Sequence, residues 1–181
     1  MKPALLILIL STLLFGGCAN APIVLNYSPS STKTVNGAFR VGDFQYLPSN
    51  NSNQIQPNQI RNTAADSLIF EKNVAEYFEE ALFKEARFVG INLNNSKNVV
   101  SGKITEFFID DLGFSVDWVL EVNYIVKRNN SQEICYNKTH KIQKTSQKFA
   151  APLGTHNEII KLNIEKAFND EDFVRCIRDV P

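Results

Sequence analysis

VDWVLEVNYIV, at residues 116–126, is the most regularly patterned stretch of this sequence. Its even-numbered positions are all apolar or aromatic, whereas its odd-numbered positions include Asp117, Glu121 and Asn123. Side chains that alternate with a period of two lie on opposite faces of a β-strand. The stretch therefore predicts a strand with one face on a core and the other face largely in water.

The segments around this strand also have strand character. Residues 99–109 precede it across the turn-forming sequence Asp-Asp-Leu-Gly, and a weaker alternation follows from residue 133 to about 147. Three strands joined by short turns predict an antiparallel meander. Residues 38–47, rich in aromatic and β-branched side chains, predict a further strand near the start of the domain.

Two segments carry the apolar stripe of an amphipathic helix. The first begins at Thr63, after the polar 49–62 segment that predicts a long loop, and ends near Gly90. The second begins at Thr155, which forms a capping-box pattern with Glu158. The expected fold is α+β, a four-stranded largely antiparallel sheet with two amphipathic helices on one face, in the order β-α-β-β-β-α.

The N-terminus has the organisation of a secretory signal. Lys2 is followed by an apolar segment, residues 4–15, that is too short for the ~20 residues needed to cross a bilayer. The small pair Gly16-Gly17 then leads directly into Cys18. This arrangement resembles the lipobox of bacterial lipoproteins, in which the cysteine becomes the first residue and carries acyl chains. An ordinary signal peptide followed by a chance cysteine is the alternative.

The lipobox divides the chain into three parts. We expect a signal peptide at 1–17, a lipidated Cys18 followed by a flexible tether through residue 36, and a single α+β domain at 37–181. The tether is expected because residues 19–36 are mostly Ser, Thr, Asn and Pro. By resemblance to enteric sorting rules, Ala19 favours the outer membrane, with the domain facing the periplasm.

Cys135 and Cys176 remain once Cys18 is assigned to lipid. An even pair in an oxidising compartment favours a disulfide. Such a bond would close a loop of about 40 residues and add roughly 4 kcal/mol of stability in the chain-entropy model. Two unpaired, buried thiols are the alternative.

Composition and motifs argue against several classes of function. The chain has 19 basic and 19 acidic side chains, so a nucleic-acid partner is not expected. The sequence has no G-x-S-x-G elbow, no H-E-x-x-H and no Walker loop. His156, at the expected helix cap, is most simply a surface residue. We therefore expect no enzymatic activity, no metal and no cofactor.

Aromatic and acidic residues gather at the expected hairpin around residues 107–118. The pair Asp110-Asp111 could bind Ca²⁺ or share a proton, but turn formation is the simpler interpretation. Phe107 and Phe108 fall on opposite faces of a regular strand, so one is expected to be exposed unless a bulge intervenes. Exposed aromatics often anchor interfaces, whereas core packing is the alternative. The candidate partner-binding residues are Phe107, Phe108, Phe114, Trp118, Asp110 and Asp111.

The lipobox, the polar tether and the element order together resemble small Gram-negative envelope lipoproteins, in an architecture like that of YajG or of the lipoprotein in the lipopolysaccharide translocon. The segment VVSGKITE, residues 99–106, is similar to a V-x-G-x-I strand common in such chains. The resemblance covers most of the mature chain as a pattern and brings no catalytic residue.

It implies a non-enzymatic outer-membrane lipoprotein, an accessory or adaptor subunit of an envelope transport or assembly complex, with a protein partner in the envelope. The alternative is a periplasm-facing carrier that holds a lipid or other small hydrophobic ligand between helices and sheet. A spacious dry cavity would favour the carrier. A packed core with an exposed aromatic patch would favour the adaptor.

Overall fold

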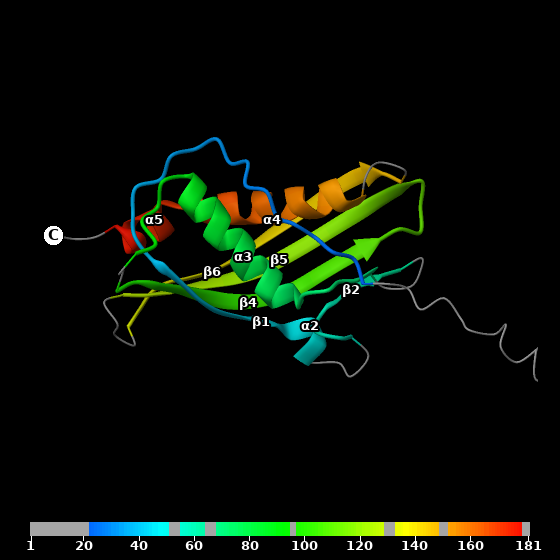
Figure 1. Ribbon diagram of the computed structural model, residues 1–181, viewed down its shortest axis with the longest axis horizontal. Coiled ribbons are helices and arrows are strands. Elements are labelled where there is room, and N and C mark those ends of the chain that lie inside the picture. Colours follow the sequence, from blue (N-terminus) through cyan, green and yellow to red (C-terminus); the bar gives the residue numbers. More distant parts are fainter. Residues whose placement is uncertain are drawn as a thin grey trace, which may run out of the picture.

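The computed structural model describes residues 22–50, 55–63, 68–94, 97–128, 133–148 and 152–178. The segment expected to be a signal peptide, residues 1–17, and the expected lipidation site Cys18 lie outside these ranges. Within them, the helices other than the short one at residues 47–50 pack on one face of a six-stranded sheet (Figure 1). The elements are β1 (Arg40–Tyr46), α2 (Leu47–Asn50), β2 (Gln59–Asn62), β3 (Leu68–Ile69), α3 (Val74–Phe88), β4 (Val99–Asp110), β5 (Ser115–Lys127), β6 (Ile134–Gln147), α4 (Pro152–Phe168) and α5 (Glu171–Ile177).

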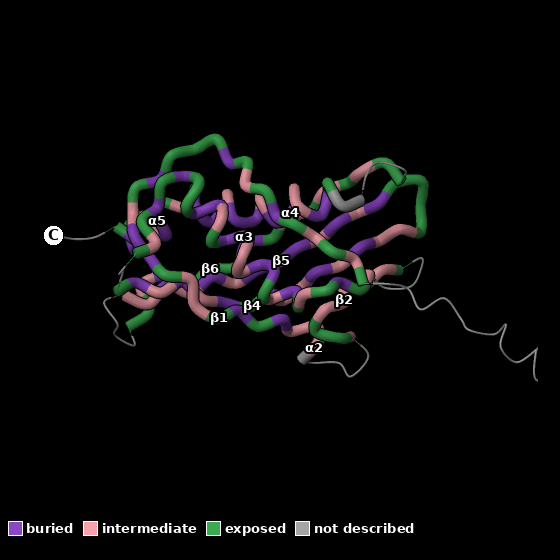
Figure 2. Tube along the Cα trace, viewed as in Figure 1, coloured by how far each residue is buried: buried purple, intermediate pink, exposed green. Residues whose placement is uncertain are grey.

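The predicted meander is present as β4, β5 and β6, paired antiparallel in that order. In β5 every even-numbered residue from Val116 to Val126 is buried, and the odd-numbered residues are partly exposed. Figure 2 shows this alternation as purple and pink segments along the strand. The period-two pattern therefore identified both the strand and the face that it turns to the helices.

The sheet is larger and more mixed than expected. It has six strands among the described residues instead of four, although most of its pairing is antiparallel. β1 pairs in parallel with the first half of β4, and β2 pairs in parallel with its end. Residues 59–62 were expected to be loop, because four residues are too few to show a period, yet Ile60 is fully buried.

Both long helices begin at other residues than the cap patterns predict. α3 starts after Asn73, because Thr63 instead bonds to the β4–β5 turn and Leu68–Ile69 forms β3. α4 starts at Pro152, a residue favoured in the first turn, where an N–H needs no helical partner. Thr155 therefore lies inside the helix. None of the described helices is both long and apolar enough to cross a membrane.

Residues 22–39, here called the strap, lie along the two long helices (Figure 1). Glu85 of α3 is 0 % exposed and anchors the strap. Its carboxylate accepts hydrogen bonds from the Tyr27 hydroxyl at 2.7 Å and from the backbone N–H groups of Ser30 and Ser31 at 3.1 and 3.2 Å. A flexible tether was expected here, but these charge-assisted bonds hold its described part against the domain.

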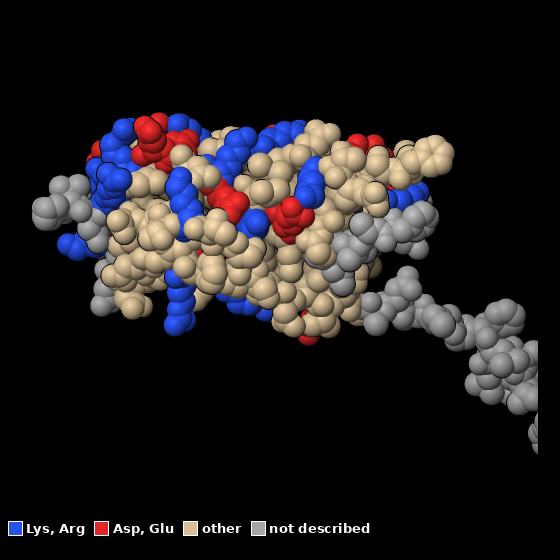
Figure 3. Space-filling view, turned by 90° about the horizontal axis from the view of Figure 1, so that it is seen from above, with Lys and Arg blue, Asp and Glu red and all other residues tan. Residues whose placement is uncertain are grey.

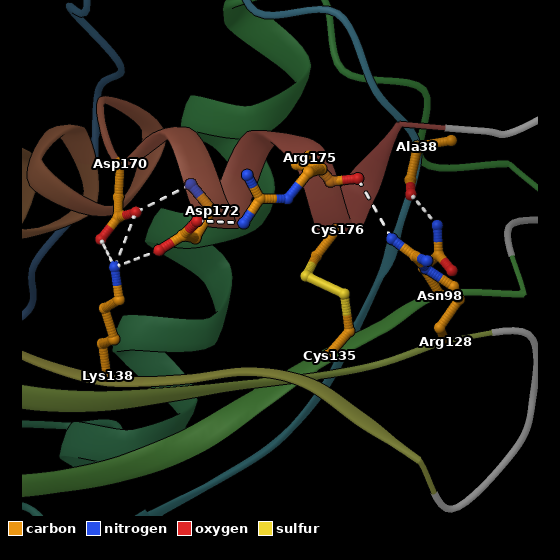
Figure 4. The surroundings of a disulfide bond; sticks show 9 residues. All are labelled: Ala38, Asn98, Arg128, Cys135, Lys138, Asp170, Asp172, Arg175 and Cys176. Carbon is orange, nitrogen blue, oxygen red and sulfur yellow. Dashed lines mark hydrogen bonds and ion pairs between the residues drawn. A yellow bond between two sulfur atoms is a disulfide. The ribbon is translucent and has the colours of Figure 1, made fainter.

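The expected disulfide joins Cys135 of β6 to Cys176 of α5, with a Cα–Cα separation of 5.8 Å (Figure 4). Beside it, the Lys138 ammonium lies 3.0 Å from the Asp170 carboxylate and 2.7 Å from that of Asp172. The last helix is therefore held to the edge strand by a covalent bond and by ion pairs.

Candidate functional site

A β-bulge in β4 decides where each aromatic side chain of the hairpin points. Ile104 pairs with Val122, but Glu106 pairs with Glu121, so Thr105 is an extra residue. The bulge shifts the alternation by one position. Phe107 consequently turns to the helices, like Ile104, and is buried, whereas Phe108 turns to the opposite, open face of the sheet.

The candidate aromatic residues are separated into three environments. Phe107 and Trp118 are buried in the core and are not accessible to a partner. The Trp118 indole N–H donates to the Ser146 hydroxyl at 3.2 Å. Phe108 is half-buried on the open face, and Phe114 at the tip of the hairpin is fully exposed. Only Phe108 and Phe114 of this group can therefore contact another molecule.

The two aspartates form the turn. The Thr63 hydroxyl donates to the Asp110 carboxylate at 2.8 Å and accepts from the backbone N–H of Asp111 at 2.9 Å. The Lys148 ammonium lies 3.2 Å from the Asp111 carboxylate and donates to the Asp111 carbonyl at 3.0 Å. Within the described ranges, no three His, Cys, Asp or Glu side chains form a group that could hold a metal ion.

A charged network crosses the open face next to Phe108. The Arg61 guanidinium lies over the Phe108 ring, 4.7 Å from its centroid. Glu106 lies 3.8 Å from Arg61 and 3.2 Å from Lys141, and Lys141 lies 3.9 Å from Glu121. Exposed ion pairs of this kind add little to stability. Their main effect is to place charges of both signs on the surface beside Phe108.

Sequence reasoning missed Arg61 and Lys141 as parts of this surface. Arg61 falls in the segment expected to be loop, and Lys141 falls in the weakly alternating strand. Arg and aromatic residues are enriched at protein interfaces, which makes the Phe108–Arg61 pair the centre of the candidate site. On the helix side, Lys and Arg are likewise interspersed with Asp and Glu, among wide uncharged areas (Figure 3).

His156 was expected on the surface but is buried. Its ring stacks on Phe107 with centroids 5.4 Å apart, and it lies 5.2 Å from each of the Phe70 and Tyr77 rings. Burial lowers the pKa of His156 to about 4, because the charged imidazolium would lose its hydration. His156 is buried because α4 begins at Pro152 and not at Thr155, which places His156 inside the helix on the side that faces the sheet.

Aromatic rings fill the layer between helices and sheet. Phe44, Phe78, Tyr124 and Phe173 make ring contacts with centroid separations of 5.1–6.4 Å. The Tyr124 hydroxyl donates to the Asn163 side-chain oxygen at 2.8 Å. A groove of about 530 Å³ lies elsewhere, between the strap and α5. Its lining includes Lys33, Asn169, Glu171, Arg175 and Arg178.

No protein-family model matches the sequence, and no curated protein matches it. Among solved structures, a Xanthomonas campestris protein described by the family model DUF330 is similar with a TM-score of 0.62 and 11 % identity, over 82 % of this chain and 92 % of that one. A hypothetical protein from Chlamydia trachomatis is similar with a TM-score of 0.51 and 10 % identity, over 77 % and 98 %. At these identities the likeness shows the fold alone.

Proposed function

We propose that this protein is a non-enzymatic, lipid-anchored adaptor of the bacterial envelope. Cys18 carries the acyl chains, the domain faces the periplasm from the outer membrane, and the open face of the sheet binds a protein partner. The sequence Gly16-Gly17-Cys18 after a short apolar segment supports the anchor. The Cys135–Cys176 disulfide suits an oxidising compartment.

One observation carries the binding role. The long helices and the strap cover one face of the sheet, and the opposite face presents Phe108, Arg61 and the network of Glu106, Lys141 and Glu121. These residues come from β2, β4, β5 and β6, so a backbone of paired strands fixes their spacing. A surface with an aromatic ring and both signs of charge suits a protein surface of complementary charge.

The packed interior favours the adaptor over the carrier. A carrier needs room for its ligand between helices and sheet, but Phe44, Phe78 and Tyr124 are buried there in mutual contact. A ligand in that layer would have to displace close-packed rings.

In-cell photocrosslinking tests the binding role. A photoreactive phenylalanine analogue is placed at Phe108, with Phe88 of α3, which is 58 % exposed, as the matched control on the helix side. We expect one dominant envelope protein to be captured from position 108 and not from position 88. Capture of the same proteins from both positions, or of lipid alone from 108, would count against the adaptor. Lys141→Glu should reduce the capture, because it reverses one charge of the network.

Cell fractionation tests the anchor separately. Cys18→Ala should leave the protein soluble or unprocessed, since no thiol remains to be acylated. Normal outer-membrane attachment of this variant would contradict the lipoprotein assignment.

A further inference from the structure

We infer that the tip of the β4–β5 hairpin, Leu112 and Phe114, inserts into the membrane surface beside the lipid anchor. This inference rests on the proposed function, because it takes acylated Cys18 as the anchor. It adds a second membrane contact and thereby an orientation of the domain on the membrane.

The tip exposes the most apolar surface in the described chain. Leu112 is 72 % exposed and Phe114 is fully exposed, and only Gly113 separates them. Both exceed the other exposed large hydrophobic residues of the described ranges. Such side chains gain free energy when they leave water for the acyl boundary of a bilayer, and aromatic rings are favoured at that depth.

The strap begins at the same end of the molecule as the tip (Figure 1). It is held there because the Ile23 N–H donates to the Ile69 carbonyl at 2.9 Å. Ile69 of β3 pairs with Gln59 of β2, and β2 runs beside β4 as far as Thr63, which bonds to the turn.

The length of chain before the strap matches this placement. Gln59 and Thr63 are four residues apart, which is about 13 Å along a strand. From Ile23 back to Cys18 there are five residues, which span at most about 17 Å. At full extension this segment is long enough to bring an acyl group on Cys18 to about the level of the turn. The hydrogen bonds of Glu85 hold the strap in place, so the strap adds no further length.

Further exposed apolar side chains lie where the strap begins. Val24 is 64 % exposed and Ile69 is 41 % exposed. The charged groups at the base of the turn include Lys148 and Asp111, 3.2 Å apart, and Asp110, whose carboxylate accepts from the Leu112 N–H at 3.3 Å. With the tip inserted, these groups would be at headgroup depth. A lipid surface accordingly fits this end better than a protein groove, since the anchor already holds the tip close to lipid.

Depth-dependent quenching tests the inference on the acylated protein in vesicles of phosphatidylethanolamine and phosphatidylglycerol. An environment-sensitive fluorophore is attached at Gly113→Cys, which keeps both apolar residues, and in a control at Thr139→Cys on the open face of β6. We expect a blue shift and quenching by brominated lipid for the label at 113, and neither for the label at 139. Leu112→Ser with Phe114→Ser should remove both signals at 113 and leave the melting temperature unchanged.

The other possible results distinguish a failure of the tip inference from a failure of the acyl anchor. If the protein floats with the vesicles but the label at 113 is not quenched, the anchor stands and the tip inference is wrong. Quenching of both labels would mean that the domain lies flat, which also contradicts it. If the protein does not float at all, the acyl anchor of the proposed function fails, and the tip inference fails with it.

Discussion

The α5 end and the hairpin end of this molecule are held together by different interactions. At the α5 end, the Cys135–Cys176 disulfide and the Lys138–Asp170 ion pair join the last helix to the edge strand. At the hairpin end, the Thr63 hydroxyl holds the turn by donating to Asp110 and accepting from the Asp111 N–H, and apolar side chains at the tip face water. One end is therefore closed covalently, whereas the other end is held by weaker bonds and presents an exposed apolar surface.

The largest expected effect concerns the covalent end. Cys135→Ser with Cys176→Ser opens a loop of 41 residues and should lower the free energy of unfolding by about 4 kcal/mol in the chain-entropy model. Denaturant titration measures the loss. Hydrogen exchange should accelerate in α5 more than in the β4–β5 turn. Equal acceleration at both ends would remove the distinction between them.

Acid should weaken the hairpin end through His156. The pKa of its folded-state imidazole is about 4, below the ordinary 6.5, so the unfolded chain takes up the proton first. The free energy of unfolding therefore has its full value, as far as His156 is concerned, above about pH 6.5. It falls by about 3 kcal/mol as the pH decreases toward 4.

His156→Leu should flatten the dependence of unfolding free energy on pH in that window. Burial also lowers the pKa of His140, so His140→Gln serves as the matched control. This variant should keep the part of the pH dependence of the unfolding free energy that comes from His156. An unchanged slope in His156→Leu would show that the buried ring does not titrate in this way.

A smaller effect is expected in the strap, which connects the two ends. Glu85→Gln replaces a carboxylate that accepts three hydrogen bonds with an amide whose N–H₂ group cannot accept one. We expect a loss of about 2 kcal/mol in the free energy of unfolding. Limited proteolysis should cut within residues 22–35 of the variant first. Glu76→Gln on the exposed side of α3 is the control and should behave like the parent protein.

The smallest expected effect is at the turn itself. Thr63→Val keeps the shape of the side chain but removes the hydroxyl that bonds to Asp110 and Asp111. Because these groups are partly solvated, the loss should be about 1 kcal/mol or less. Amide exchange at residues 110–114 should rise while that of α5 stays constant, and a rise in α5 would contradict independent ends.

The features that could be predicted from the sequence are those encoded by a pattern of neighbouring residues. Alternation in β5 identified the meander and its buried face, and the apolar stripe within residues 63–90 predicted that α3 is an amphipathic helix, although α3 begins only at Val74. The even pair of cysteines pointed to the disulfide that is found. The parallel pairing of β1 and β2 with β4 was not predicted, because distant segments meet there without a common local pattern.

The candidate site was predicted only in part. A bulge was foreseen as a possibility between Phe107 and Phe108, but neither Gly nor Pro marks its position at Thr105. The packing of the strap against α3 could have been predicted from one residue in the sequence. Glu85 follows Leu82 and Ala81 on the apolar stripe of α3, and an acid in that position needs a partner from elsewhere in the chain.

The two cysteines of the disulfide become available at different times while the chain is being made. Synthesis begins at the N-terminus, as the proposed export would, so β1 to β5 arrive before Cys135, and Cys176 follows 41 residues later. During that interval a thiol at Cys18 could oxidise with Cys135 and trap a wrong loop. Attachment of the lipid to the Cys18 sulfur, which the proposed anchor requires, would remove this competitor. The lipid would then act as a protecting group for the oxidation as well as an anchor.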